Sequence, residues 1–379
     1  MKSQDKKLLF SALKGMVLIA LACALCRFTK GVGAGVIAGI AVVCAFTNRL
    51  GFALIAYILF PFMIILNPIV LPLRGITPMV LRIAPMVVSI VLVVVGASRH
   101  GNNQIPLGMM WSFLGVAALC STTGYYPEIS YLKILNCAIL FIGLNLGFRN
   151  IDRRPNDVMT IRRFCLVISS FLIWGSVFLY VFLPGAGYLS SMRSMAAEGM
   201  SSAAAMAAAE GGMRLFCGVT NQSQCLATVL PVSVSWLACD MFFVEKRLSK
   251  YHLLTIALGL PLVYLTRSRS ALLTSVVGAC FIYGYCLRKV NIRPQIRRKI
   301  RSAMYMFGAV IMVAVGVMEV RNQSISKWVR KTEDVSGDRR GLGEAFTSSR
   351  QGLIEASMAD FKANPLFGMG FQVTEDMKY

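Results

Sequence analysis

Residues 164–183 read FCLVISSFLIWGSVFLYVFL, a run without a charged side chain. A helix needs about 20 apolar residues to cross roughly 30 Å of hydrocarbon, so this run is long enough. Its apolar residues do not alternate with polar ones, as they would in a strand of a membrane barrel. Only a helix then satisfies its own backbone hydrogen bonds in lipid. The run therefore predicts a transmembrane helix.

Similar apolar runs recur along all 379 residues, of which 56% are hydrophobic and 15% are charged. A soluble domain of this size would carry more charge. We therefore predict an all-α, polytopic integral membrane protein with about 11 transmembrane helices. No small-residue cleavage site follows the first run, so we expect that run to be retained. The predicted spans are near 8–25, 31–46, 50–66, 79–96, 107–123, 130–147, 164–183, 222–243, 251–265, 270–287 and 303–319.

The distribution of Lys and Arg predicts the orientation of the chain, because cytoplasmic connections hold the excess of positive charge. If the N-terminus is cytoplasmic, the three densest basic clusters all fall in cytoplasmic connections and the C-terminal segment is extracytoplasmic. The net charge of +22 is then mostly a topology signal. It also suits the anionic headgroups of membrane lipids, and we expect no nucleic-acid partner. The three clusters are residues 149–163, 246–250 and 288–301.

Two predicted outer segments are longer than the other connections. An outer loop covers residues 184–221, and its Ala-, Met- and Ser-rich part at 192–212 favours a helix too short and too polar to span. The end of the chain mixes charges of both signs and contains one helical stretch at 348–363. We therefore divide the chain into a transmembrane helical domain, residues 1–319, and an extracytoplasmic segment, residues 320–379.

Histidine and cysteine give no sign of a metal site or a catalytic triad. His100 and His252 lie in predicted cytoplasmic connections without a Cys or carboxylate partner at ligand spacing, and we expect both to be solvated at the surface. Most cysteines lie in apolar runs, and only Cys217 and Cys26 approach the outer surface. We expect neither a bound metal nor a disulfide framework. The GxG at 368–370 has no strand before it and does not indicate a dinucleotide.

Arginines at the predicted outer face are the candidate ligand-binding residues. Arg267 and Arg269 lie between two apolar runs with almost no loop to hold them, and Arg214 precedes the polar cluster 220–224. Arg350 begins the outer helical stretch. The guanidinium group matches phosphate oxygens in a bidentate geometry, which suits a diphosphate at a membrane surface. The alternative is interfacial anchoring with stop-transfer charge, and the spacing alone leaves both open.

Three stretches carry a resemblance to a known family. Residues 214–224, RLFCGVTNQSQ, have an Arg, Gly and Asn pattern at the start of a span, and residues 266–271, TRSRSA, form a short Ser-Arg turn between spans. Residues 349–371 contain an Arg, a helical stretch and then Asn-Pro-Leu-Phe-Gly-Met-Gly, the most specific of the three patterns. Together they resemble the O-antigen ligase and O-antigen polymerase superfamily of bacterial membrane glycosyltransferases.

The resemblance implies a ligase or a polymerase in the bacterial inner membrane, with its site at the outer face. The donor is a glycan on undecaprenyl diphosphate, the acceptor is another glycan, lipid A-core or a protein, and neither a cofactor nor a nucleotide sugar is needed. The arginines bind the carrier diphosphate, the Asn shapes the site, and the glycines let the chain turn beside the sugar. The substrate-binding residues implied are Arg214, Asn221, Arg267, Arg269, Arg350, Gly368 and Gly370.

The resemblance leaves the catalytic base unknown. In the family a His further along the same outer segment is the expected base, with another span or two after it. The sequence reaches only Tyr379, so we expect either a fragment or a truncated member whose activity is open. Glu355 and Asp360 are alternative bases, and nothing in the sequence favours them over solvated helix carboxylates.

A transporter or flippase for envelope solutes is the alternative function. A chain with many spans and scattered Gly and Pro fits that class without any motif. Against it, the two halves show no internal repeat and no carboxylate lies in the middle of a span. Asp240 and Glu319, near the ends of predicted spans, come closest.

Overall fold

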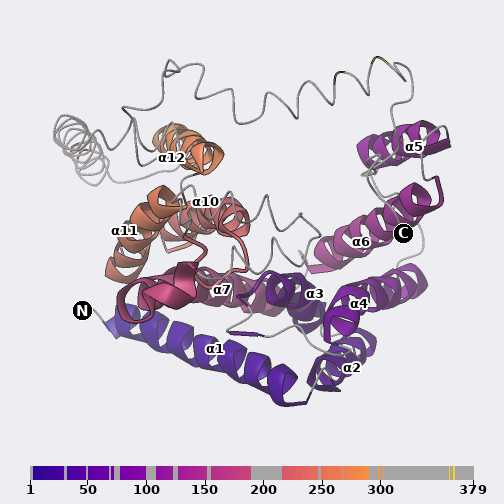
Figure 1. The fold of residues 1–379 in the computed structure, drawn as a ribbon, viewed down its shortest axis with the longest axis horizontal. Coiled ribbons are helices and arrows are strands. Elements are labelled where there is room, and N and C mark those ends of the chain that lie inside the picture. Colours follow the sequence, from indigo (N-terminus) through magenta and orange to yellow (C-terminus); the bar gives the residue numbers. More distant parts are fainter. Residues whose placement is uncertain are drawn as a thin grey trace. The chain divides into compact units, whose positions relative to one another are not determined.

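The described chain is helical almost throughout (Figure 1). Within the described residues, the one pairing of the β type is an isolated bridge between Leu66 and Thr220. Four single residues, 298, 302, 358 and 362, are described outside the continuous ranges. The computed structural model describes, besides these, residues 3–29, 32–47, 50–67, 70–71, 77–99, 108–122, 127–151, 155–188, 216–245, 249–266 and 268–289.

The described helices, apart from one short π-helical turn, have 15 to 28 residues. Residues 184–188 add a short helical turn after the seventh. In chain order the helices are α1 (Ser3–Phe28), α2 (Val32–Phe46), α3 (Leu50–Ile64), α4 (Thr77–Arg99), α5 (Gly108–Thr122), α6 (Pro127–Ile151), α7 (Pro155–Phe182), α10 (Ser223–Cys239), the π-helical turn η1 (Asp240–Val244), α11 (Lys250–Leu265) and α12 (Arg269–Lys289).

These helices coincide with the first ten predicted spans, to within a few residues at most ends. The largest difference is α7, which begins at Pro155 rather than near residue 164. Pro at the first helical position and Asp157 in the first turn both favour a helix start there, so the helix extends beyond its apolar run. The predicted segments 192–212 and 303–319 lie outside the described residues. The structure describes only Met358 and Lys362 of the stretch 348–363, and both are helical.

Three described helices are long and apolar enough to cross a membrane, namely Asp5–Phe28, Pro155–Phe182 and Ser223–Val244. Many large apolar side chains on the helices are exposed, for example Leu18 of α1 at 66% and Phe182 of α7 at 68%. Soluble proteins rarely expose apolar surface on this scale, whereas lipid covers it in a bilayer. The described chain is therefore all-helical with the features of a membrane protein, and the number of spans stays a prediction.

The chain divides into two compact units, which we describe separately. The first unit holds α1, most of α7, and α10 to α12, and the second holds α2 to α6. The first consists of Met1–Arg27, Ile65–Leu73 and Arg163–Phe346. The second consists of Phe28–Ile64, Arg74–Arg162 and Thr347–Tyr379.

In the first unit, α10 is the central helix and packs against both α11 and α12. Leu226, Leu230 and Leu237 of α10 are buried in a core to which α7 contributes Leu166 and Ile173. In lipid, such helices associate through close packing, because the surrounding lipid tails are as apolar as the core.

Glycines let the helices of the first unit approach closely. A Cβ added at Gly259 of α11 would lie 2.9 Å from Val234 Cγ2 of α10 and 3.1 Å from Ile173 Cδ1 of α7. A Cβ added at Gly15 of α1 would overlap Val167 of α7. Small residues at such contacts are typical of helix pairs in membranes.

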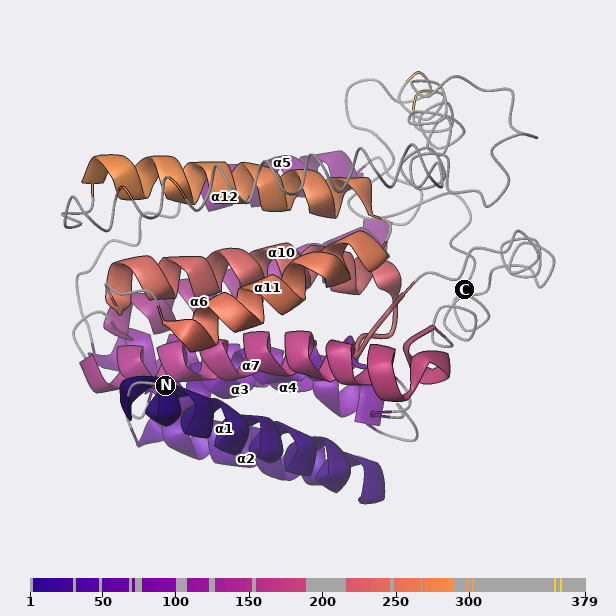
Figure 2. The same ribbon diagram turned by 90° about the vertical axis from the view of Figure 1, so that its left-hand side faces the viewer.

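The helices of the first unit run back and forth between two ends (Figure 2). At one end, which we call the motif end, α7 and α11 finish and α10 and α12 begin, so it holds residues 184–188, 216–223 and 266–269. At the other, the N-terminal end, α1 and α11 begin and α10 passes into η1.

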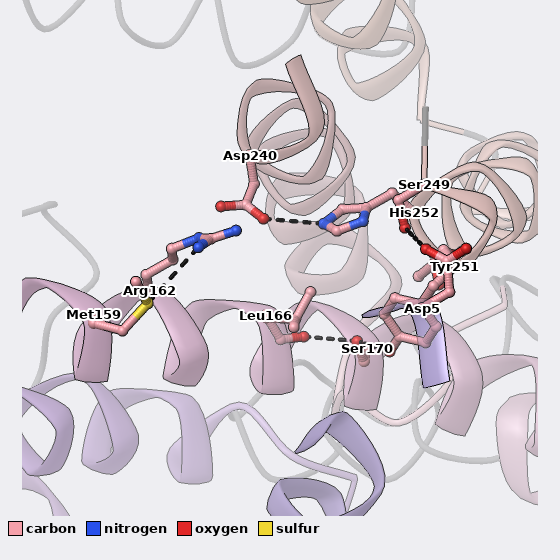
Figure 3. Close-up of polar contacts among 10 residues, drawn as sticks. Asp5, Met159, Arg162, Leu166, Ser170, Asp240, Ser249, Tyr251 and His252 are labelled. Carbon is pink, nitrogen blue, oxygen red and sulfur yellow. Dashed lines mark hydrogen bonds and ion pairs between the residues drawn. The ribbon is translucent and has the colours of Figure 1, made fainter. Parts of the chain in front are cut away.

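Buried polar contacts hold the N-terminal end together (Figure 3). Ser249 Oγ donates to Asp5 Oδ1 at 3.0 Å, and His252 Nε2 lies 3.0 Å from Asp240 Oδ2. His252 is 0% exposed, so the prediction of a solvated histidine without a carboxylate partner is wrong. Asp240, which begins η1 directly after α10, contacts His252 in the first turn of α11. The prediction fails because a separation of 12 residues in the sequence does not reveal this contact. His100 lies outside the described residues.

In the second unit, α4 packs against α2, α3 and α6, and α5 packs against α6. Leu114 and Ala117 of α5 form a small buried cluster with Ile134 of α6. Tyr57 Oη of α3 donates to the carbonyl oxygen of Leu140 in α6 at 3.2 Å. A hydrogen bond between membrane helices stabilises the fold by about 0.6 kcal/mol on average.

Candidate functional site

The motif end of the first unit contains a cluster of three turns from distant parts of the sequence. Its segments are residues 65–71, 184–188 and 216–222, of which 68 and 69 lie outside the described residues. We call this set the turn cluster. Its third segment is the part of the predicted Arg-Gly-Asn pattern that the structure describes. Because buried turns leave backbone groups without helical partners, those groups must find partners in the neighbouring segments.

The backbones of the first and third segments pair directly. Asn67 N–H donates to the carbonyl oxygen of Val219 at 2.7 Å. Asn221 N–H donates to the carbonyl oxygen of Ile65 at the same distance of 2.7 Å. These bonds lie on either side of the isolated bridge in the same two segments. The segment before α10 is therefore fixed in register against the segment that follows α3 in the sequence.

The Asn67 side chain links all three segments. Its Nδ2 donates to the carbonyl oxygen of Ala186 at 3.0 Å and to that of Gly218 at 3.2 Å. The backbone carbonyl oxygen of Asn67 accepts from Val70 N–H at 2.8 Å and from Leu71 N–H at 2.9 Å. Asn67 is 0% exposed, so these bonds form away from solvent.

Gly218, the glycine of the predicted pattern, has a backbone conformation that requires glycine. Its φ is +54°, in the left-handed region that side chains with a Cβ rarely adopt. A Cβ at this position would also overlap Ser176 Oγ of α7. That hydroxyl accepts from Val219 N–H at 3.2 Å, so it cannot move without losing a bond of the turn.

Aromatic packing covers the turn cluster. The Phe216 ring centroid lies 5.3 Å from that of Tyr188 and 5.7 Å from that of Tyr180, both with the rings edge to face. Such pairs add about 0.5–1.5 kcal/mol beyond the area that they bury. Cys217 and Cys26, the cysteines predicted to approach the outer surface, are both buried in the fold.

The turn cluster brings Asn221 to the start of α10. Gln222, the next residue, has an extended conformation and is the N-cap residue of that helix. The Thr220 hydroxyl lies 2.8 Å from the carbonyl oxygens of both Cys217 and Gln222, which closes the turn. Asn221 is half-buried between this turn and the helix.

The predicted Ser-Arg turn is a tight connection between α11 and α12. Thr266 caps the end of α11. Its N–H donates to the carbonyl oxygen of Leu262 at 3.2 Å, and its hydroxyl donates to the carbonyl oxygen of Val263 at 2.8 Å. Ser268 immediately precedes α12, and its Oγ accepts from Ala271 N–H at 3.3 Å in the manner of an N-cap residue. The two caps leave room for one residue, Arg267.

The N-termini of α10 and α12 lie close to each other at the motif end. The two helices pack together and run in the same direction from that end. A Cβ added at Gly278 of α12 would lie 2.9 Å from Ser235 Oγ of α10. Along the helices Gly278 is about 14 Å from Arg269, and Ser235 is about 18 Å from Ser223, so the starts lie within about one turn of the same level. Each start carries a partial positive charge of about half an elementary charge.

Two of the predicted substrate-binding residues thus lie at the same end of one unit. Asn221 immediately precedes α10, and Arg269 is the first residue of the neighbouring α12. The side chain of Arg269 lies outside the description. Outside the described residues altogether are Arg214, Arg267, Arg350, Gly368 and Gly370.

Residues 254–379 match the family model described as O-Antigen ligase. The chain carries an O-antigen ligase domain. The matched range begins in α11 and includes the Ser-Arg turn, α12 and the stretch 349–371, whereas the turn cluster precedes it. Comparisons with curated proteins and with solved structures give no match.

The ligase domain confirms the family that residues 266–271 and 349–371 predicted. Members of this family are glycosyltransferase-like ligases whose substrates are glycans and lipid-linked molecules. Apolar helices of membrane-spanning length in the same chain agree with a membrane location. The match does not favour the transporter alternative.

The sequence did not single out Asn67 or Ser176. A polar residue followed by Pro at 67–68, directly after an apolar run, is a turn signal. That signal marks a turn but not its partners, which lie 119 and 151 residues further along the chain.

Proposed function

We propose that this protein transfers a glycan from an undecaprenyl diphosphate carrier to an acceptor hydroxyl at the outer face of the bacterial inner membrane. The acceptor is another glycan, lipid A-core or a protein. The observation that carries the proposal is the O-antigen ligase match over residues 254–379, in a chain whose Ser-Arg turn lies at the same end of a helical unit as the turn before α10.

The electrostatics of the motif end support a diphosphate ligand. The N-termini of two neighbouring helices, α10 and α12, lie there, and each favours an anion. Arg269 is the first residue of α12 and adds a positive charge to the sequence at this helix start. In this proposal the helix start and that charge both favour an anion at this end.

In this proposal Arg214, Arg350 and either Arg267 or Arg269 hold the carrier diphosphate. Asn221 shapes the same site at the start of α10. Gly368 and Gly370 let the chain turn closely beside the sugar. These roles come from the family's pattern, residue by residue.

The reaction is a displacement at the anomeric carbon of the donor sugar. The acceptor oxygen forms the new glycosidic bond, and the bond between the anomeric carbon and the diphosphate oxygen breaks. The diphosphate leaves with the bonding electron pair as undecaprenyl diphosphate, and the hydroxyl proton passes to a base or to water. Arginine charge at the leaving oxygens stabilises the negative charge that develops there.

The proposed topology has about 11 spans, with the N-terminus in the cytoplasm and residues 320–379 outside it. The motif end then faces outward, where a translocated lipid-linked glycan is found. The N-terminal end of the first unit faces the cytoplasm, together with the basic connection at 246–250.

Arg350→Ala tests the proposal in the purified full chain, reconstituted in vesicles with a glycan on undecaprenyl diphosphate. We expect turnover, measured as acceptor-dependent release of undecaprenyl diphosphate, to fall by about 100-fold, because one transition-state contact is lost. Arg350→Lys keeps the charge but not the bidentate geometry of the guanidinium group, so its turnover should lie between those of wild type and Arg350→Ala. Lys362→Ala, an exposed cation in the same segment, is the matched control and should stay within about twofold.

Two results would contradict the proposal. One is a wild-type protein that moves the lipid-linked glycan across the vesicle membrane and forms no glycosidic bond. The other is an Arg350→Ala variant whose turnover equals that of Lys362→Ala while both insert into vesicles equally well.

A further inference from the structure

We propose that Asn67 is a positioning residue for donor binding, which acts by fixing the segment between Gly218 and Asn221. This inference rests on the proposed function and adds to it a residue that lies outside the three predicted patterns. Asn67 touches no substrate in this proposal. It sets the shape of the turn that presents Asn221.

The chemistry of the contact requires an amide. Asn67 Nδ2 faces two carbonyl oxygens, of Ala186 at 3.0 Å and of Gly218 at 3.2 Å. An NH₂ group offers two donors, which is the number needed there. A carboxylate of the same shape offers none and would place negative oxygen against two carbonyl dipoles. No partner with one donor, such as a hydroxyl, serves both carbonyls at once.

The position of Asn221 follows from these contacts through the backbone. Gly218 is held by Asn67, Val219 is held through its carbonyl by Asn67 N–H, and Asn221 N–H is held by Ile65. The segment from 218 to 221 is therefore fixed at both ends by residues 65–67. If the Asn67 side chain loses its two bonds, one of those ends loosens and Asn221 loses its fixed place before α10.

The rest of the first unit does not depend on Asn67. α10 is held by its own buried residues, among them Leu226, Leu230 and Leu237. α7 and α11 are joined by a separate buried bond, between Ser170 Oγ and Tyr251 Oη at 2.6 Å. Loss of the Asn67 amide should therefore disturb the turn and leave the helices packed.

The test compares Asn67→Ala and Asn67→Asp with Tyr251→Phe, which removes one buried hydrogen bond of the same unit away from the motif end. We expect both Asn67 variants to raise the KM for the undecaprenyl diphosphate-linked donor at least tenfold. The KM for the acceptor should change less than twofold, and Tyr251→Phe should change neither. A merely structural role would lower the amount of active protein and leave both KM values unchanged.

Two native cysteines report the disturbance independently of activity. Cys217 lies in the turn cluster and Cys26 near the end of α1, and they are 0% and 1% exposed. With a membrane-impermeant maleimide and peptide mass spectrometry, we expect Asn67→Ala to label Cys217 at least fivefold faster than wild type. Cys26 should label at the wild-type rate.

The outcomes separate this inference from the proposed function. A donor KM within twofold of wild type in Asn67→Ala overturns the positioning role alone. Faster labelling of both cysteines also overturns it, because Asn67 would then hold the whole unit together. A wild-type chain without transferase activity overturns both the proposed function and the role of Asn67 in donor binding. The rate of Cys217 labelling then reports only on the structure of the turn.

Discussion

Gly218 shapes the motif end through its backbone conformation and through its lack of a side chain. Its positive φ turns the chain toward α10, and its missing Cβ leaves the space that Ser176 Oγ occupies. That hydroxyl also accepts from Val219 N–H. Gly218 and Ser176 of α7 therefore stabilise the same turn together. The glycine in the family's pattern thus has a backbone role at this position.

Gly218→Ala should lower the free energy of unfolding by more than about 1 kcal/mol, since it combines a strained φ with a steric overlap. Gly185→Ala in the same turn cluster is the matched control, because a Cβ there meets nothing within 4 Å. Unfolding of both variants in detergent, followed by loss of helical circular dichroism, checks the difference. Equal stabilities would show that the turn tolerates a Cβ at 218.

Helices are the level at which the sequence was most informative. The apolar runs predicted α1 to α7 and α10 to α12, because long apolar runs without alternation favour helices. The start of α7 at Pro155 was missed, since its polar first turns carry no apolar signal. The π-helical turn η1 was missed too, and with it the contact of Asp240 with His252, because nothing in the composition marks that turn.

Close contact between helices predicts a second substitution effect. Gly259→Val should destabilise the protein by about 1–3 kcal/mol, because the added atoms press against Val234 of α10 and Ile173 of α7. Gly35→Val in α2 makes the same change of helix propensity where a Cβ meets nothing within 4 Å. The midpoints of thermal unfolding in detergent compare the two. If Gly259→Val melts with Gly35→Val, α10 and α11 are not packed as closely as described.

At the scale of the whole molecule, the alternation of predicted spans indicates which connections share a side. In the first unit, the turn before α10 and the turn before α12 share the motif end, while the starts of α1 and α11 share the other. That relative arrangement agrees with the alternation. The contacts of the Asn67 side chain were beyond reach of sequence reasoning, because they join residues more than 100 positions apart.

The predicted orientation of the whole chain in the membrane can be tested by cysteine labelling. In a background without native cysteines, single cysteines at 205 and 375 should react with a membrane-impermeant maleimide added outside intact cells. A cysteine at 247 should react only after the membrane is opened, because the basic connection is expected in the cytoplasm. Labelling at 247 in intact cells would reverse the proposed topology and place the motif end inside.

The bond between Asn67 and Gly218 spans 151 residues, which has a consequence for biosynthesis. At roughly 5–20 residues per second, a ribosome needs about 8–30 s to make the chain between the two residues. During that interval the ribosome makes four described helices, α4 to α7, before the turn after α3 can be completed. The segment 65–71 is thus made early, but its contacts in the first unit form only late. A ribosome stalled before residue 218 leaves Asn67 without the carbonyl oxygen of Gly218 as a partner.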